Sequence, residues 1–119
     1  MGKSRLFFYD FETTGLNPYH DKIIEYCFIE DNKEHILQSL VNPHQKFEYL
    51  ITKLTGIHPE ELENQHGIEI HITSIIDFLE NGPRNTNVYL VAHNNDGFDK
   101  LFLKNIIKKY GQEYYQQIN

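Results

Sequence analysis

The stretch that decides the fold is Phe7-Phe8-Tyr9-Asp10-Phe11-Glu12-Thr13-Thr14-Gly15-Leu16, which begins as an apolar run and ends in two carboxylates and a polar turn. Residues i and i+2 of a β-strand point to the same face of its sheet, so we expect Asp10 and Glu12 side by side at the strand end. Two negative charges at that distance repel each other, which makes the ionised form of both carboxylates less favourable. A bound divalent cation would neutralise this repulsion, and Mg²⁺ prefers one or two carboxylates together with waters and substrate phosphates. The stretch therefore predicts a strand that ends in a metal site.

Residues 6–11 place apolar side chains on both faces of this strand. We therefore expect this strand to be central in its sheet and covered on both faces. Two further strands, over residues 22–29 and 35–41, are separated by the turn signal Asp31-Asn32 and predict a hairpin. A fourth strand, short and buried, is predicted over residues 88–92.

Helices are predicted between and after these strands. Residues 47–55 indicate a short helix or turn, residues 59–62 a short helix with Pro at its first position, and residues 65–70 a loop. An amphipathic helix is indicated by apolar residues at i, i+3, i+4 and i+7, namely Ile72, Ile75, Ile76 and Leu79. The last helix is predicted to end at about Tyr110, with Gly111 as its C-cap. This order predicts an α/β fold, a mixed sheet with helices on its faces.

Composition limits the classes of function. A chain of 119 residues holds at most one domain. The single cysteine, Cys27, excludes an internal disulfide and favours an intracellular setting, cytoplasmic or nuclear. We find no apolar stretch typical of a signal peptide or a transmembrane segment, so no membrane partner is expected. The net charge of −6 weighs against a simple nucleic-acid-binding module, but less against a metal-dependent nuclease, whose bound ions supply positive charge.

A second polar constellation, His93-Asn94-x4-Asp99, also follows a predicted strand. An isolated Asp-x-Glu pair is a weak signal, since most such pairs are solvated surface acids. Here the first pair follows an apolar run and precedes Thr13-Thr14-Gly15, which supplies hydroxyls, backbone N–H groups and room for a ligand near the backbone. Asp99 near the start of a helix is also compatible with a purely structural role in which it stabilises the helix dipole.

Together the two motifs resemble the DEDD, or DnaQ-like, superfamily of 3′–5′ exonucleases, whose fold is RNase H-like. Residues 8–16 match the first motif, and residues 90–94 followed by Phe98-Asp99 match the second; residues 21–25 and 54–57 resemble the linking segments. The four residues between Asn94 and Asp99 are similar to the three-prime repair exonuclease branch. The resemblance implies antiparallel strands 1–3, a parallel strand 4, and one exonuclease domain over residues 1–119.

The resemblance also implies a site. Asp10, Glu12 and Asp99 would be catalytic ligands of two Mg²⁺ or Mn²⁺ ions, which act on phosphodiester bonds at a single-stranded DNA or RNA 3′ end. The implied substrate-binding residues lie in three short segments: Thr13, Thr14, Gly15 and Leu16; Leu54 and Thr55; His93 and Asn94. A proofreading role and a DNA-repair role would use the same motifs.

One part of the family pattern is absent. Members carry a third motif with a histidine or tyrosine base and a fourth aspartate, but here no Asp follows Asp99 and no His follows His93. We therefore expect the chain to be the N-terminal two-thirds of the domain, with the C-terminal part of the fold missing. Three functions stay open: a metal-dependent exonuclease, an inactive nucleic-acid- or nucleotide-binding module, and a structural domain, which the three motif carboxylates argue against. DNA or RNA preference and oligomeric state are not predicted.

Overall fold

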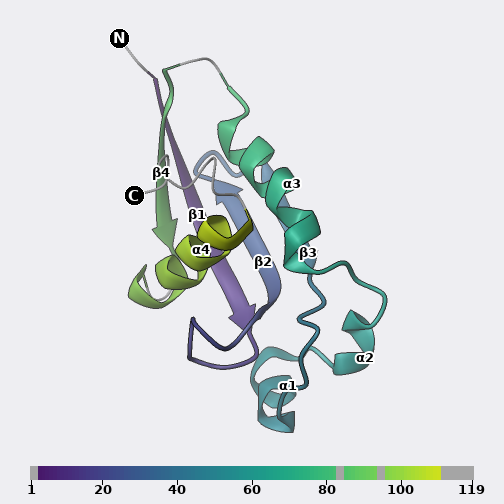
Figure 1. Ribbon diagram of the computed structural model, residues 1–119. Coiled ribbons are helices and arrows are strands. Elements are labelled where there is room, and N and C mark those ends of the chain that lie inside the picture. Colours follow the sequence, from purple (N-terminus) through teal and green to yellow (C-terminus); the bar gives the residue numbers. More distant parts are fainter. Residues whose placement is uncertain (1–2, 83–84, 94–95, 111–119) are drawn as a thin grey trace.

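A computed structural model of the chain describes residues 3–82, 85–93 and 96–110 (Figure 1). The elements follow the order expected from the sequence, with three strands, then three helices, then a strand and a helix. They are β1 (Ser4–Thr13), β2 (Ile23–Glu30), β3 (Ile36–Leu40), α1 (Tyr49–Thr55), α2 (Pro59–Leu62), α3 (Ile68–Glu80), β4 (Asn87–Ala92) and α4 (Asp96–Tyr110).

The described strands form one mixed sheet in the order β3-β2-β1-β4. β1 is antiparallel to β2 and β2 is antiparallel to β3, whereas β4 runs parallel to β1. The predicted mixed α/β sheet and the central place of the first strand are both confirmed. Because β1 and β4 are parallel neighbours, their carboxyl ends meet at one end of the sheet, where both sequence motifs begin.

The core lies on one face of this sheet. Alternate residues of β1, namely Phe7, Tyr9 and Phe11, are buried there, and the Tyr9 ring stacks on Phe28 of β2 with 5.6 Å between centroids. α3 and α4 cover this same face (Figure 1). α3 contributes the predicted apolar stripe, Ile72, Ile75, Ile76 and Leu79. α4 contributes a second stripe, Phe102, Leu103 and Ile107.

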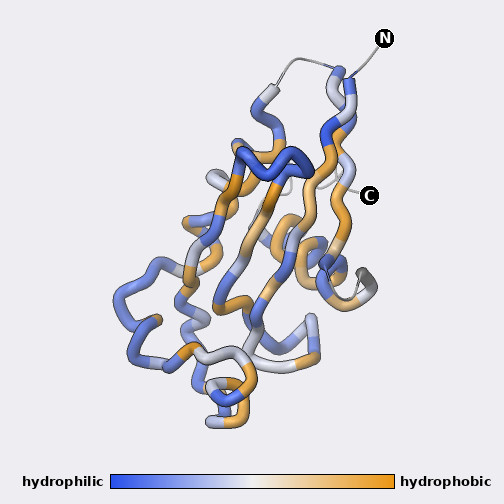
Figure 2. The backbone as a smooth tube through the Cα atoms, turned by 180° about the vertical axis from the view of Figure 1, so that it is seen from behind, coloured by the Kyte–Doolittle hydropathy of each residue, from blue (hydrophilic) through white to orange (hydrophobic). Residues whose placement is uncertain are grey.

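The expectation that the first strand is covered on both faces is wrong for the described residues. Phe8, on the opposite face of β1, is 40% exposed, and its neighbour Val91 on β4 is exposed as well. Figure 2 views this open face, where the strands lie in front of the helices. β4 was also expected to be buried, but only Ala92 among its residues is. The reason is that α3 and α4 pack on the same side and β4 is an edge strand in the described sheet.

The helix boundaries differ from the prediction at two places. α1 begins at Tyr49 and ends before Gly56, whose φ of 78° is the left-handed conformation that a glycine C-cap provides. α3 begins at Ile68, inside the stretch predicted as loop, because apolar spacing alone does not show where a helix starts. α4 ends at Tyr110 as predicted, while Gly111 lies outside the described residues. Within those residues, no helix combines the length and apolar character needed to cross a membrane.

Candidate active site

The two carboxylates of β1 lie on its open face. Asp10 is paired in register with Cys27, and Glu12 is paired with Glu25, all on β1 and β2. Since directly paired residues of antiparallel strands point to the same side, Glu25 adds a third acid to this face. Glu25 was not among the site residues predicted from the sequence. The available signal was an acid that interrupts an otherwise apolar strand.

The electrostatics of this group are those of an acidic cluster. Burial raises the pKa of Glu12, and the charges of Asp10 and Glu25 raise it further. Burial, together with the same two neighbours, also raises the pKa of the Cys27 thiol. A bulge between Glu12 and Thr13 breaks the β1–β2 register at this point, a feature that often re-aims side chains next to a functional site. Carboxylates crowded in this way fit a divalent cation, which would lower the repulsion between them.

The turn after β1 is fixed by its own side chains. The Thr13 hydroxyl donates to the Gly15 carbonyl oxygen at 2.6 Å. Thr14 is buried, and its Oγ1 accepts the Lys22 N–H at 2.9 Å. A Cβ at Gly15 would meet the Asp21 carboxylate, so a larger residue there would require this side chain to shift. The two hydroxyls predicted to bind substrate therefore have structural partners, and their substrate contacts stay a prediction.

Leu16 and the α1 residues are differently placed. Leu16 is 84% exposed and Leu54 is 72% exposed, so both are free to contact a ligand. Thr55 donates its hydroxyl to the Ile51 carbonyl within α1. α1 lies beyond the end of the sheet at which β1 ends (Figure 1). These three predicted substrate residues thus lie toward the same end of the molecule.

Gln45 joins these two regions and was not found from the sequence. Its Oε1 lies 2.7 Å from the Thr14 hydroxyl, and its Nε2 donates to the His20 carbonyl at 3.1 Å. Gln45 therefore ties the segment before α1 to the β1–β2 turn. A lone Gln in a polar stretch gives no periodic signal, which is why sequence reasoning passed over it.

The second motif lies at the adjoining end of β4 and the start of α4. His93 donates its backbone N–H to the Tyr9 carbonyl at 2.8 Å, which holds the end of β4 against β1. Asp99 is only 2% exposed. Asn94 lies outside the described residues. Within the described ranges, no three His, Cys, Asp or Glu side chains are grouped so that they could hold a metal ion. The structure thus places Asp10 and Glu12 on the same face of β1, but it does not show Asp99 forming a three-ligand group with them.

The chain is similar to exonucleases and to the exonuclease parts of DNA polymerases. The RNase_T family model, described as Exonuclease, matches residues 7–119. The PolC-type DNA polymerase III of Thermotoga petrophila is 38% identical over 103 residues, which are 84% of this chain and 7% of the polymerase. The 3′-5′ exonuclease DinG of Bacillus subtilis is 31% identical over 115 residues, which are 93% of this chain and 12% of DinG. The chain therefore spans only a small part of these relatives.

Solved structures give the same fold. An apo structure of exonuclease I matches with a TM-score of 0.74 at 23% identity, and the match covers 98% of this chain and 28% of the exonuclease I chain. A zinc-bound complex of E. coli exonuclease I with single-stranded DNA has a TM-score of 0.72 at 23% identity, covering 91% and 24%. The predicted RNase H-like exonuclease fold is confirmed. The three-prime repair branch is not supported by the PolC and DinG relatives, since a spacing that differs by one loop residue is weakly constrained.

Proposed function

The chain belongs to the RNase T family of exonucleases, and from this membership we propose that it is a metal-dependent 3′–5′ exonuclease domain that acts on single-stranded nucleic-acid ends. The observation that carries the proposal is that Asp10 and Glu12 lie on the open face at the end of β1, where the charges of Asp10 and Glu25 raise the pKa of Glu12. Acids gathered at the carboxyl end of a central strand are expected where a cation and a phosphodiester bind together.

Each predicted residue has a role in this proposal. Asp10 and Glu12 would hold the cations, and Asp99 would join them from α4. Bound Mg²⁺ or Mn²⁺ would stabilise the attacking and leaving oxygens of an in-line hydrolysis. The exposed Leu16 and Leu54 would pack against the terminal nucleotide. The other members of the proposed substrate set are Thr13, Thr14, Gly15, Thr55, His93 and Asn94.

The domain assignment is part of the same proposal. We place residues 1–119 in one exonuclease domain, as its N-terminal two-thirds, because the third family motif does not occur after Asp99. The same observation favours a second candidate function. A protein that carried the first two motifs without the third would bind a nucleic-acid end or a nucleotide without cleaving it.

One experiment separates the two functions. A 5′-labelled single-stranded oligonucleotide is incubated with the chain over a Mn²⁺ titration, and shortened products are resolved on a gel while binding is followed by fluorescence anisotropy. The first proposal expects a metal-dependent ladder that Asp10→Asn reduces by more than the roughly 10–100-fold lost when an outer-sphere metal partner is removed. Asp77→Asn, which neutralises an exposed acid of α3, is the matched control and should cleave normally.

The other outcomes are equally informative. Metal-dependent binding without cleavage, lost in Asp10→Asn, would support the binding module and contradict the exonuclease. Cleavage that survives in Asp10→Asn would remove the assigned carboxylates from the reaction. Absence of both metal binding and strand binding would contradict both candidates.

A further inference from the structure

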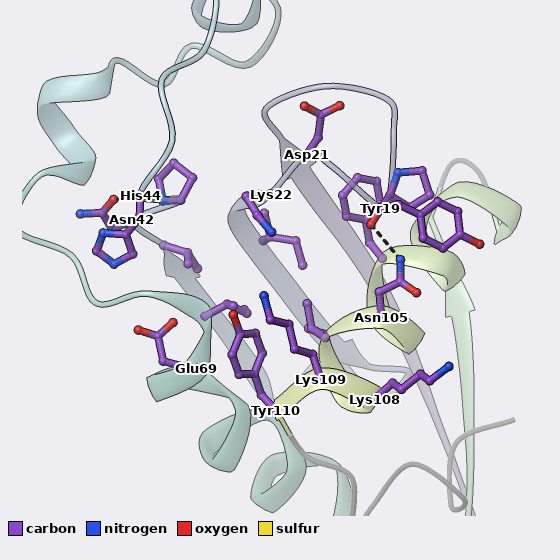
Figure 3. A pocket seen from close by; sticks show the side chains of 17 residues that line it. Tyr19, Asp21, Lys22, Asn42, His44, Glu69, Asn105, Lys108, Lys109 and Tyr110 are labelled. Carbon is purple, nitrogen blue, oxygen red and sulfur yellow. Dashed lines mark hydrogen bonds between the residues drawn. The ribbon is translucent and has the colours of Figure 1, made fainter.

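A separate cavity of about 660 Å³ lies between the β1–β2 turn, the start of α3 and the end of α4 (Figure 3). Its volume is within the range of small-ligand sites, about 300–1,000 Å³. The floor is apolar and is formed by core residues of the helix-covered side, among them Ile23, Val41 and Phe102. None of the proposed catalytic carboxylates lines it, so this cavity is distinct from the acidic site on the open face.

Two ammonium groups converge on the cavity from opposite walls. Lys22 enters from the β1–β2 turn and Lys109 from α4, and their side chains extend toward each other in Figure 3. The Lys109 Nζ lies 5.0 Å from the centroid of the Tyr110 ring, a cation–π contact. Among the residues that the structure describes, neither lysine forms a salt bridge. Two unneutralised cations facing one apolar-floored space, in a chain of net charge −6, indicate an anionic ligand.

The two acidic residues that line the cavity, Asp21 and Glu69, do not neutralise the lysines. The Asp21 carboxylate accepts the Asn17 N–H at 2.9 Å and points away from the cavity. Glu69 lies in the first turn of α3 with its carboxylate against Gly67, where it complements the helix dipole. Neither carboxylate neutralises the space between the two lysines.

The walls are fixed in place before any ligand arrives. The Thr14 N–H donates to the Lys22 carbonyl at 2.8 Å, and the Lys22 N–H donates to Thr14 Oγ1 at 2.9 Å. From the other side, Asn105 Nδ2 of α4 donates to the Pro18 carbonyl at 2.8 Å, which ties the turn to the helix (Figure 3). A cavity whose walls are already joined loses little conformational entropy when it binds.

Two tyrosine rings also line the cavity. Tyr19 and Tyr110 lie on opposite sides of the rim, and both rings are exposed. A nucleobase stacks on such rings regardless of its sequence identity. We propose that this cavity binds a nucleotide, with its phosphate between Lys22 and Lys109 and its base against the tyrosine-lined rim. The nucleotide would come either from a free nucleoside monophosphate or from one unit of a single strand.

The test measures binding with EDTA present, so that it does not depend on the acidic site or on any cleavage. The full chain is titrated with dTMP, and separately with thymidine, by NMR. We expect dTMP to bind and thymidine to bind at least about tenfold more weakly, because the lysines recognise the phosphate. The double substitution Lys22→Gln with Lys109→Gln should weaken dTMP binding by about tenfold or more.

The matched control removes two exposed lysines outside the cavity, Lys33→Gln with Lys53→Gln. Both double variants have the net charge −8, from −6 less two positive charges, so a general loss of attraction would affect them equally. Equal weakening in both, or no weakening in the cavity variant, would overturn the proposal, as would failure of dTMP to bind. The single variant Lys109→Gln, checked by circular dichroism, repeats the test if the double variant is unfolded.

A short strand distinguishes the two sources of the nucleotide. If the cavity variant weakens binding of the tetranucleotide dT4 as much as binding of dTMP, the cavity holds a unit of a strand. If only dTMP binding is weakened, the cavity holds the free monophosphate. Because cleavage is never measured, failure of the exonuclease proposal would leave these results unchanged.

Discussion

Repulsion within the acidic group on the open face lowers the stability of the folded chain; the group consists of Asp10, Glu12 and Glu25. Burial and the two neighbouring charges raise the pKa of Glu12, so the folded chain binds a proton there more readily than the unfolded chain does. Stability from this group is therefore present at low pH and lost as the pH rises through its folded pKa. At neutral pH without metal, we predict that Glu12→Gln stabilises the chain by about 0.2–1 kcal/mol, the range for cross-strand pairs.

The measurement is urea unfolding at pH 7 in EDTA and again with Mg²⁺. The proposed metal site predicts that Mg²⁺ stabilises the wild-type chain and has less effect on Glu12→Gln, since a ligand that binds only the folded state adds its binding free energy. Glu34→Gln, at an exposed position after β2, is the control. Equal stabilisation of all three chains by Mg²⁺ would contradict the assignment of Glu12 as a ligand.

His71 provides a second prediction at the scale of one residue. Its Nδ1 lies 2.8 Å from the Tyr26 hydroxyl, and burial lowers its pKa. The unfolded chain then binds the proton first, at about pH 6.5, so stability should fall as the pH drops from there through the folded pKa. Titration of the histidine ring by NMR measures this pKa directly. A value above 6.5, or a pH 5–7 stability profile unchanged in His71→Gln, would contradict the prediction.

At the scale of elements, Arg5 and Glu30 join β1 to the end of β2. The Arg5 guanidinium donates to both Glu30 oxygens, from Nε at 2.9 Å and Nη2 at 2.7 Å, and its centre lies 4.9 Å above the Phe7 ring. Glu30→Gln removes the charged partner from a partly exposed guanidinium that still donates to the Asn81 carbonyl, so it should cost about 1 kcal/mol. Denaturant unfolding at pH 7 checks this, with Glu34→Gln as the exposed control.

The same pair predicts a pH dependence. The hydrogen bond from Arg5 holds the pKa of Glu30 below its ordinary value. Its stabilisation is therefore complete above the unfolded pKa of about 4.3 and is lost as the pH falls through the folded pKa. Wild-type chain should lose more stability than Glu30→Gln on acidification below that value. Parallel losses in the two chains would show that the pair contributes nothing to acid sensitivity.

Elements were predictable from the sequence where one physical pattern dominated. The apolar spacing of Ile72 to Leu79 depends only on the helical period, and the structure confirms its buried stripe. The coverage of β1 was not predictable, because an apolar face such as that of Phe8 shows that burial is favourable without showing which element provides it. Glu25 and Gln45 were missed because their roles depend on pairing with residues distant in the sequence, which local patterns do not encode.

At the scale of the whole molecule, the described chain is a sheet with one covered and one open face. Phe8, Tyr89 and Val91 adjoin one another on the open side of β1 and β4, and all three are substantially exposed. Contiguous apolar surface of this kind is uncommon on soluble monomers. It also leads directly to Asp10, so the acidic site lies at the margin of an apolar surface.

This open face gives the last prediction. The folded chain should bind the dye 8-anilinonaphthalene-1-sulfonate under native conditions, because the dye partitions onto exposed apolar surface. Tyr89→Thr with Val91→Thr keeps residues that favour strands while removing much of that surface, so it should reduce the dye fluorescence. Leu50→Thr with Ile70→Thr, at exposed positions in α1 and α3, is the control and should leave most of the signal. Unchanged fluorescence in the β4 variant, with its thermal transition preserved, would show that the open face is not accessible in solution.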